Sequence, residues 1–132
     1  YKRQNREGHY RQARMIKKEK VEKLFKYSLT NPLIIVEGKR DEEALRLFGF
    51  NRIIKIAGKP LEEVVKKVDE KVVILTDFDE EGRKIKRELV RMFERKGVKV
   101  DNYLRRLIRS FGITKIEELK YVKEFYERRK AE

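Results

Sequence analysis

Three short segments rich in β-branched residues recur in the middle of the chain, at 33–36, 52–56 and 72–76, and the first and third contain continuous apolar runs. Continuous runs of this kind are typical of strands buried on both faces of a parallel sheet. Segments with helical spacing of apolar residues follow them, at 41–48, 61–68 and 80–96, and residues 98–100 read as a short fourth strand. Because strands and helices alternate with short links, the pattern predicts an α/β fold with a four-stranded parallel sheet flanked by helices.

The two ends of the chain differ from this middle part. Residues 1–31 read as a basic helical arm, whose apolar stripe should pack on the main domain or on a second chain. Residues 101–132 read as a C-terminal helical extension, with a capping box of Thr114 and Glu117 before its last helix. We therefore expect a central catalytic-type domain at 32–100, and a homodimer that would use the terminal helices.

The charge of the chain is strongly positive and unevenly spread. Its 36 lysines and arginines outnumber its 23 acids, which gives a net charge of +13, and residues 1–30 alone hold ten basic and three acidic residues. Such asymmetry predicts a polyanionic partner, with nucleic acid as the first candidate and Arg11, Arg14 and Lys18 as arm contacts. The other interpretation is a solvated surface like those of heat-loving organisms, since 45% of the residues are charged.

Several classes of protein are excluded or disfavoured by composition. The chain has no cysteine, which excludes disulfides and thiolate metal sites. No apolar run approaches the ~20 residues that cross a bilayer, and the N-terminal residues do not lead into the apolar stretch of a secretory signal. We therefore expect a cytoplasmic protein without a membrane partner.

Acidic residues follow the first and third predicted strands. In a parallel sheet these strand ends share one rim, where ligands bind. Asp77 and Asp79 are two apart in extended chain, so their carboxylates should project to one side and repel unless a cation or proton lies between them. Magnesium, or manganese in its place, suits such oxygen ligands, and Glu37 and Glu81 could add further carboxylates. Helix capping explains one aspartate of the pair, but not both together with Glu37.

Glycines and cations accompany these acids at the same rim. Gly38 would let the chain turn sharply after the first strand, and Gly82 would let the next helix approach a neighbouring element or a phosphate closely. Lys39, Lys59 and Arg83 are candidate phosphate contacts. Ordinary surface cations paired with nearby acids are the alternative interpretation of these three residues.

Glu37-Gly38-Lys39-Arg40-Asp41, followed by Asp77-Phe78-Asp79-Glu80-Glu81-Gly82, resembles the Toprim domain, the catalytic domain of topoisomerases, bacterial-type primases and certain nucleases. The resemblance covers about residues 32–100. It implies that Glu37, with Lys39 beside it, serves as a general acid or base in phosphoryl transfer, and that Asp77, Asp79 and Glu81 hold magnesium. The whole chain is similar to small stand-alone Toprim proteins of archaea and bacteria, and its Val36-Glu37-Gly38-Lys39 run resembles Toprim ribonucleases that trim ribosomal RNA.

Two functions remain open at this point. The chain shows neither a recognisable tyrosine-bearing domain of a topoisomerase nor the zinc module of a primase. We predict a magnesium-dependent nuclease, with RNA processing as a candidate role; the alternative is a non-catalytic nucleic-acid-binding or ribonucleoprotein component that keeps a metal site. A hydrolase of the Asp-x-Asp type fits less well, because its motif normally follows the first strand and here follows the third. A receiver domain fits less well, because the paired acids after the first strand and the lysine of a late strand have no convincing match.

Overall fold

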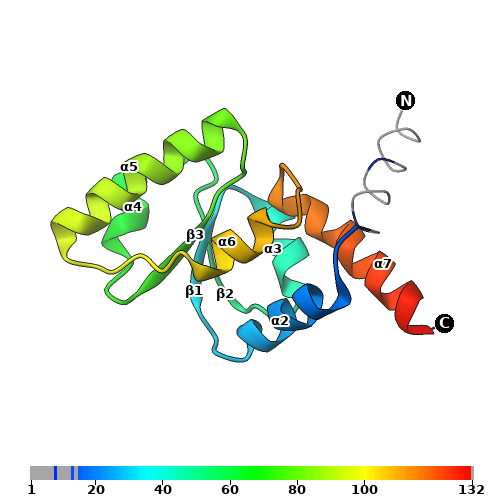
Figure 1. Ribbon diagram of the computed structural model, residues 1–132. Coiled ribbons are helices and arrows are strands. Elements are labelled where there is room, and N and C mark those ends of the chain that lie inside the picture. The colour runs from blue at the N-terminus through cyan, green and yellow to red at the C-terminus, as the bar shows by residue number, and fades with distance from the viewer. Residues whose placement is uncertain (1–7, 9–12, 14, 132) are drawn as a thin grey trace.

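A three-stranded parallel sheet forms the centre of the computed structural model, which describes residues 8, 13 and 15–131 (Figure 1). The strands are β1 (Leu33–Val36), β2 (Arg52–Lys55) and β3 (Val72–Leu75), and their order is β2-β1-β3. Each strand is four residues long, and β1 is hydrogen-bonded to both neighbours. The predicted α/β fold with a parallel sheet flanked by helices is confirmed.

Alternate residues of the strands enter two separate hydrophobic cores. Ile34 and Val36 face one core, and Ile35 and Ile74 face the other, because successive side chains of a strand point to opposite faces. The first core is covered by α2 (Lys18–Ser28), α3 (Lys39–Arg46), α6 (Tyr103–Arg109) and α7 (Leu119–Ala131). The second core is covered by α4 (Leu61–Lys66) and α5 (Glu80–Lys96). Figure 1 shows these two groups of helices on opposite sides of the sheet.

The predicted fourth strand is wrong. Residues 98–100 form only an isolated parallel bridge between Val100 and Val72 at the outer edge of β3. Val72 donates its amide to the carbonyl of Lys99 and accepts the amide of Asp101. The side chain of Asp101 then accepts the amide of Tyr103, where α6 begins, so the chain leaves the sheet edge after one pairing.

The terminal segments are built into the first core. Val21 and Leu24 of α2 are fully or almost fully buried, as are Leu119 and Val122 near the start of α7. In the part of the arm that the structure describes, Gly8 and Ala13 are helical, residues 15–17 interrupt the predicted helix, and α2 begins at Lys18. The predicted contacts Arg11 and Arg14 lie outside the described residues. None of the described helices is both long and apolar enough to span a lipid bilayer.

The predicted capping box of Thr114 and Glu117 is displaced by one residue. The chain enters α7 through a 3-10 turn, η1 (Ile116–Glu118), and Glu118 accepts the backbone amide of Lys115 at 2.9 Å. A turn that starts at Ile116 places Glu118, rather than Glu117, three residues after the last extended residue. Glu117 is thereby left to face the acidic residues described next.

Candidate active site

The carboxyl ends of β1 and β3 lie side by side, and the chain leaves them in opposite directions. β1 leads to α3 on one face of the sheet, whereas β3 leads to α5 on the other. Such a divergence between neighbouring strands marks the usual ligand position in open α/β folds, and it is called the crevice below. Glu37 follows β1 and Asp77 lies two residues beyond β3, so both occupy that crevice.

Glu37 and Asp77 are in direct contact. The backbone amide of Asp77 donates a hydrogen bond to Oε2 of Glu37, with 2.7 Å between nitrogen and oxygen. Burial raises the pKa of Glu37 most, and the negative charges of Asp77 and Asp79 raise it further, against the hydrogen bond from the Asp77 amide. The first and third strand ends, 40 residues apart in sequence, therefore form one acidic site.

The side chain of Asp77 is held by the segment that leads into α7. Its Oδ1 accepts the amide of Ile116 at 2.9 Å, and the next amide, that of Phe78, donates to the carbonyl of Thr114 at 2.7 Å. Burial is the largest cause that raises the pKa of Asp77, and the charge of Asp79 raises it as well. The C-terminal extension therefore closes one wall of the site.

Asp79 joins the site as the N-cap of α5. Its Oδ1 accepts the amide of Gly82 at 2.8 Å, which satisfies one free donor of the first helical turn. Gly82 packs so closely on the Asp77 peptide that a Cβ at this position would overlap the Asp77 carbonyl. Gly38 differs: its φ of −153° is extended, and a Cβ there would meet nothing within 4 Å. The predicted close approach thus occurs at Gly82, while Gly38 is not demanded by the local backbone.

Two further acids belong to the site and were not predicted. Asp41 is 7% exposed, and its Oδ2 accepts the amide of Gly38 at 3.0 Å. Burial, together with the charges of Asp77, Glu37 and Glu117, raises the pKa of Asp41 to about 6. Asp41 stands within the run that follows the first strand, and its position three residues after the helix cap was the available signal. Glu117 offered no signal apart from its sequence position near the displaced capping box.

The electrostatics of the site favour a cation. Glu37, Asp41 and Asp77 all have pKa values above the usual range, and each is raised by burial and by neighbouring carboxylates. Lys115 is a nearby cation that lowers the pKa of both Glu37 and Asp77. Partly buried acids that repel one another become more stable when a metal ion or a proton joins them.

The donor chemistry of the site fits magnesium, although the side chains do not form a ready coordination shell. Magnesium prefers oxygen ligands and keeps several waters, so one or two carboxylates suffice. Among residues 15–131, no three acid or histidine side chains are grouped closely enough to hold an ion as they stand. Glu37, Asp77 and Asp79 each give one oxygen to a backbone amide, and within the described chain the second oxygen of each makes no hydrogen bond.

The remaining predicted site residues are not joined to the acidic site by any side-chain hydrogen bond or ion pair that the described residues make. Glu81 is exposed in the first turn of α5, and Lys39 is exposed at the first position of α3. Lys59 is exposed in the loop after β2, and Lys18 is exposed at the start of α2. For these four side chains, the described part of the structure contains no hydrogen bond or ion pair to the acidic site. Arg83 lines a separate basic pocket next to it.

Arg105 supports the acidic site from behind, and sequence reasoning missed it. Its guanidinium is buried, donates to the carbonyl oxygen of Thr76 at 2.7 Å, and lies 3.3 Å from the carbonyl oxygen of Asp77. Burial lowers its pKa to about 10, with the charge of Arg109 as the second cause. The sequence offers no local signal for Arg105, which is one of 36 basic residues. The guanidinium therefore holds the end of β3 that presents Asp77.

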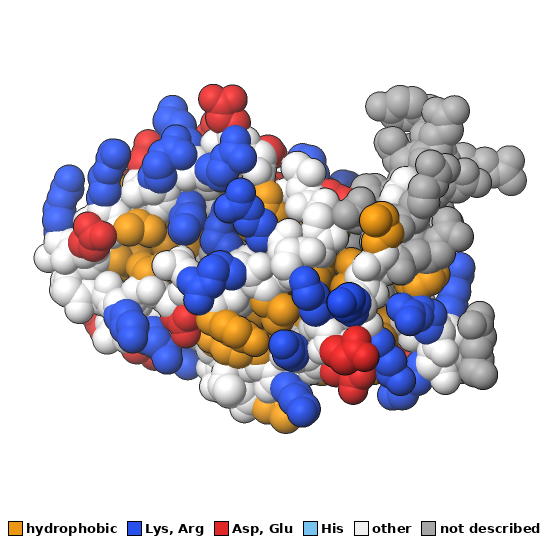
Figure 2. Space-filling model, viewed as in Figure 1, with side chains coloured by type: hydrophobic (Ala, Val, Ile, Leu, Met, Phe, Trp, Pro, Cys, Tyr) orange, Lys and Arg blue, Asp and Glu red, His pale blue; other side chains and the backbone are white. Residues whose placement is uncertain are grey.

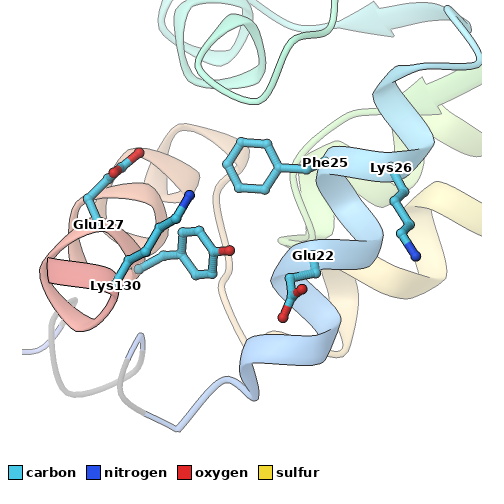
Figure 3. Close-up of a pocket in the computed structure, with 6 residues that line it drawn as sticks. Glu22, Phe25, Lys26, Glu127 and Lys130 are labelled. Atoms are coloured by element: carbon cyan, nitrogen blue, oxygen red, sulfur yellow. The ribbon is translucent and has the colours of Figure 1, made fainter. Parts of the chain in front are cut away.

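A second pocket lies away from these acids, between α2 and α7 (Figure 3). Phe25 and Tyr126 meet there with ring centroids 5.6 Å apart, and Phe25 also packs on Phe48. The charged lining contains two acids and two lysines: Glu22, Lys26, Glu127 and Lys130. The aromatic residues of both terminal helices thus pack within one chain, while a homodimer through these helices stays a prediction.

Taken together, the fold and site define an α/β protein with a cluster of acids where two parallel strands diverge. Residues 32–119 match the Toprim domain family. A UPF0292 protein of Methanocaldococcus jannaschii is 39% identical over 94 residues, which cover 65% of this chain and 73% of that protein. A UPF0292 protein of Pyrococcus horikoshii is 44% identical over 92 residues, with 65% and 70% covered. A solved structure of a protein from Aquifex aeolicus has a TM-score of 0.67 and 32% identity, covering 79% of this chain and 98% of that one.

The chain therefore belongs to the Toprim domain family. The expected resemblance to Toprim proteins is confirmed, and it makes this a nucleic-acid-related domain of a type that binds Mg²⁺. The relatives named above carry only a family designation, so the reaction has to be argued from the site itself.

Proposed function

We propose that this protein is a magnesium-dependent nuclease of the Toprim type, with RNA as the first substrate to test. The observation that carries the proposal is the contact between the Glu37 carboxylate and the Asp77 amide at the diverging strand ends. It brings a carboxylate of raised pKa next to an aspartate pair that can share a divalent cation. A proton donor and a metal position side by side are what phosphodiester cleavage requires.

Each acid has a distinct role in this proposal. Asp77 and Asp79 would hold the metal through the oxygens that do not bind backbone amides, and Glu81, in the first turn of α5, would be a further candidate ligand. When bound, magnesium stabilises charge on the phosphate oxygens. Glu37 is fixed by one oxygen and uses the other to hold or release a proton at the reacting oxygen. Its raised pKa brings this proton transfer closer to neutral pH.

The cations around the crevice would bind the substrate backbone. Lys39 and Lys59 are exposed beside the ends of β1 and β2, and Lys18 lies at the start of α2. Arg83 follows the aspartate motif on α5, while Arg11 and Arg14 belong to the basic arm. Together these residues would attract the phosphates electrostatically without reading the base sequence.

Cleavage of labelled RNA and DNA with MgCl₂, and with MnCl₂ in parallel, tests the proposal. The double variant Asp77→Asn, Asp79→Asn is the sharpest comparison, because asparagine keeps an acceptor oxygen for the amides of Ile116 and Gly82. We expect the rate to fall by at least ~100-fold, in line with the loss of metal-assisted charge stabilisation. Equal rates for the wild type and this variant would disprove the metal mechanism.

A non-catalytic nucleic-acid-binding role is the second candidate. It is favoured by the lack of a ready coordination shell among the described residues and by the net charge of +13. It predicts binding that weakens steeply with salt and no turnover with either metal. Removing residues 1–12 deletes four basic residues and one acid while leaving α2 in the core, so this truncation tests the arm without exposing Val21 and Leu24.

A further inference from the structure

A small pocket lined almost entirely by cations lies next to the acidic site. Its walls come from the Phe78 loop, from α5 and from α6, and its volume is about 160 Å³. The lining residues are Phe78, Arg83, Lys86, Arg87, Arg105 and Arg109. Figure 2 shows lysine and arginine side chains gathered over the face formed by α5 and α6. Five positive side chains around one small hollow call for a counter-charge.

Among the described residues, no ion pair supplies that counter-charge to the four cations that surround Arg105. No ion pair within the described residues involves Arg83, Lys86, Arg87 or Arg109. Elsewhere on the surface some lysines and arginines do pair with acids, as Arg52 pairs with Glu70 at 2.8 Å. Burial lowers the pKa of Lys86, and the charges of Arg105 and Arg109 lower it further, which shows that these cations repel one another.

The base of the pocket is held by contacts of Arg105 and is connected to the acidic site. Arg105 lies over the Phe78 ring, with 4.8 Å from its guanidinium carbon to the ring centroid. The same guanidinium donates to the carbonyl of Thr76 and contacts that of Asp77. Phe78 stands between Asp77 and Asp79 in sequence, so one short loop forms a wall of both the pocket and the acidic crevice.

We propose that this pocket binds a phosphoryl group of the nucleic-acid strand whose neighbouring phosphodiester lies at the acidic site. The proposal rests on the proposed function for the position of that neighbour. A volume of about 160 Å³ is below the roughly 300–1,000 Å³ of pockets that enclose a whole small molecule, so it suits one phosphoryl group rather than a nucleoside. Arginine forks and a lysine are the side chains that bind phosphate oxygens best. The group is either a backbone phosphate or a terminal monophosphate.

Binding of a short labelled single-stranded RNA, and of DNA of the same sequence, is measured in EDTA over a range of salt concentrations. The test variant is Lys86→Gln, Arg109→Gln, which leaves the buried Arg105 in place. The matched control is Lys84→Gln, Arg91→Gln, with the same charge change at exposed positions of α5 outside the pocket. Arg87→Gln serves as a second test variant if the double variant unfolds, as judged by circular dichroism.

The pocket variant should bind more weakly than the control and should lower the salt slope by about 0.7 for the phosphate contact that it loses. Oligonucleotides with phosphate or hydroxyl ends separate the two sources. If the wild type prefers oligonucleotides with phosphorylated ends and the pocket variant does not, the pocket binds a terminal phosphate. If the variant loses the same affinity for phosphate-ended and hydroxyl-ended oligonucleotides, the pocket binds a backbone phosphate. Wild-type protein that binds neither RNA nor DNA, or a pocket variant that binds like the control, would overturn the inference.

The use of EDTA separates this test from the proposed function. Weak binding by the pocket variant, together with no magnesium-dependent cleavage by the wild type, would support the phosphate-binding pocket and refute the nuclease proposal. Normal binding by the variant, together with wild-type cleavage that depends on Asp77 and Asp79, would do the reverse.

Discussion

The backbone amide of Asp77 donates a hydrogen bond to the carboxylate of Glu37, at 2.7 Å, between the ends of two adjacent parallel strands. This bond orients the Glu37 carboxylate and leaves one of its oxygens without a hydrogen bond among the described residues. It also determines which substitutions can separate the chemistry of Glu37 from its contribution to stability.

Glu37→Gln should abolish cleavage and preserve the fold. Glutamine keeps an acceptor oxygen for the Asp77 amide, so the free energy of unfolding should change by less than about 1 kcal/mol. The cleavage rate should fall by at least ~100-fold, because glutamine cannot hold or release the proton. Single-turnover cleavage and urea unfolding measure the two effects. Glu37→Ala, which also removes the acceptor, should cost about 1–3 kcal/mol, and a Glu37→Gln protein with normal turnover would refute the assigned role.

Asp79 should show a similar separation between capping and metal binding. Asp79→Ala removes the cap of α5 and should lower the free energy of unfolding by about 1 kcal/mol, whereas Asp79→Asn should leave it almost unchanged. Both variants should bind magnesium more weakly than the wild type, because each removes a negative charge. Urea unfolding and calorimetric titration with MgCl₂ provide the measurements. Unaltered magnesium affinity in both variants would place the ion elsewhere.

Gly82 and Gly38 should respond in opposite ways to alanine. A Cβ at Gly82 would overlap the carbonyl of Asp77, so Gly82→Ala should destabilise the fold by about 1–3 kcal/mol and disturb the site. A Cβ at Gly38 meets nothing within 4 Å, and its φ of −153° suits any residue, so Gly38→Ala should cost less than about 1 kcal/mol. Thermal or urea unfolding of the two variants, compared side by side, decides the matter; similar losses would contradict the packing described here.

Without magnesium, stability should fall as pH rises through the range in which Asp41 ionises. Its pKa is raised from 3.8 to about 6 by burial and by Asp77, Glu37 and Glu117, so between these values the folded state binds more protons than the unfolded state. The stabilisation of the fold by the proton on Asp41 is complete below about pH 4 and is lost above about pH 6. A shift of about 2 pKa units corresponds to at most about 3 kcal/mol.

Asp41→Asn tests this dependence because asparagine keeps an acceptor for the Gly38 amide and carries no charge. The variant should become increasingly more stable than the wild type between about pH 4 and about pH 6, and the difference should then level off. Urea unfolding in EDTA across this range measures it. A difference that does not change with pH would show that Asp41 is not held among repelling acids.

Most of the central fold and the core of the site could be predicted from local sequence. The runs 33–36 and 72–75 are apolar at every position, which is typical of strands covered on both faces. Acids placed directly after such runs must lie at the strand ends, and neighbouring parallel strands bring those ends together. The predicted neighbourhood of Glu37 and Asp77 followed from this reasoning. Their roles in metal binding and proton transfer stay predictions.

Residues whose importance comes from long-range packing could not be found in this way. Arg105 is one of 36 basic residues, and only burial against the end of β3 distinguishes it. Glu117 belongs to a turn whose register was misjudged by one residue, so its approach to Asp77 and Asp41 was not foreseen. The prediction of a fourth strand was wrong for a related reason. Residues 98–100 have strand composition, but the turn into α6 leaves only Val100 paired with Val72.

The sequence by itself determined the α/β class, the parallel strands, the family and the edge of the sheet at which the acids lie. The apolar patterns of strands and helices, and the motifs that follow them, can be read from residues that are close together in the chain. Tertiary structure alone decided that the sheet stops at three strands, that residues 114–118 close over Asp77, and that cations of α5 and α6 surround one hollow beside it. Those features depend on how distant segments pack against one another, and no local pattern encodes that packing.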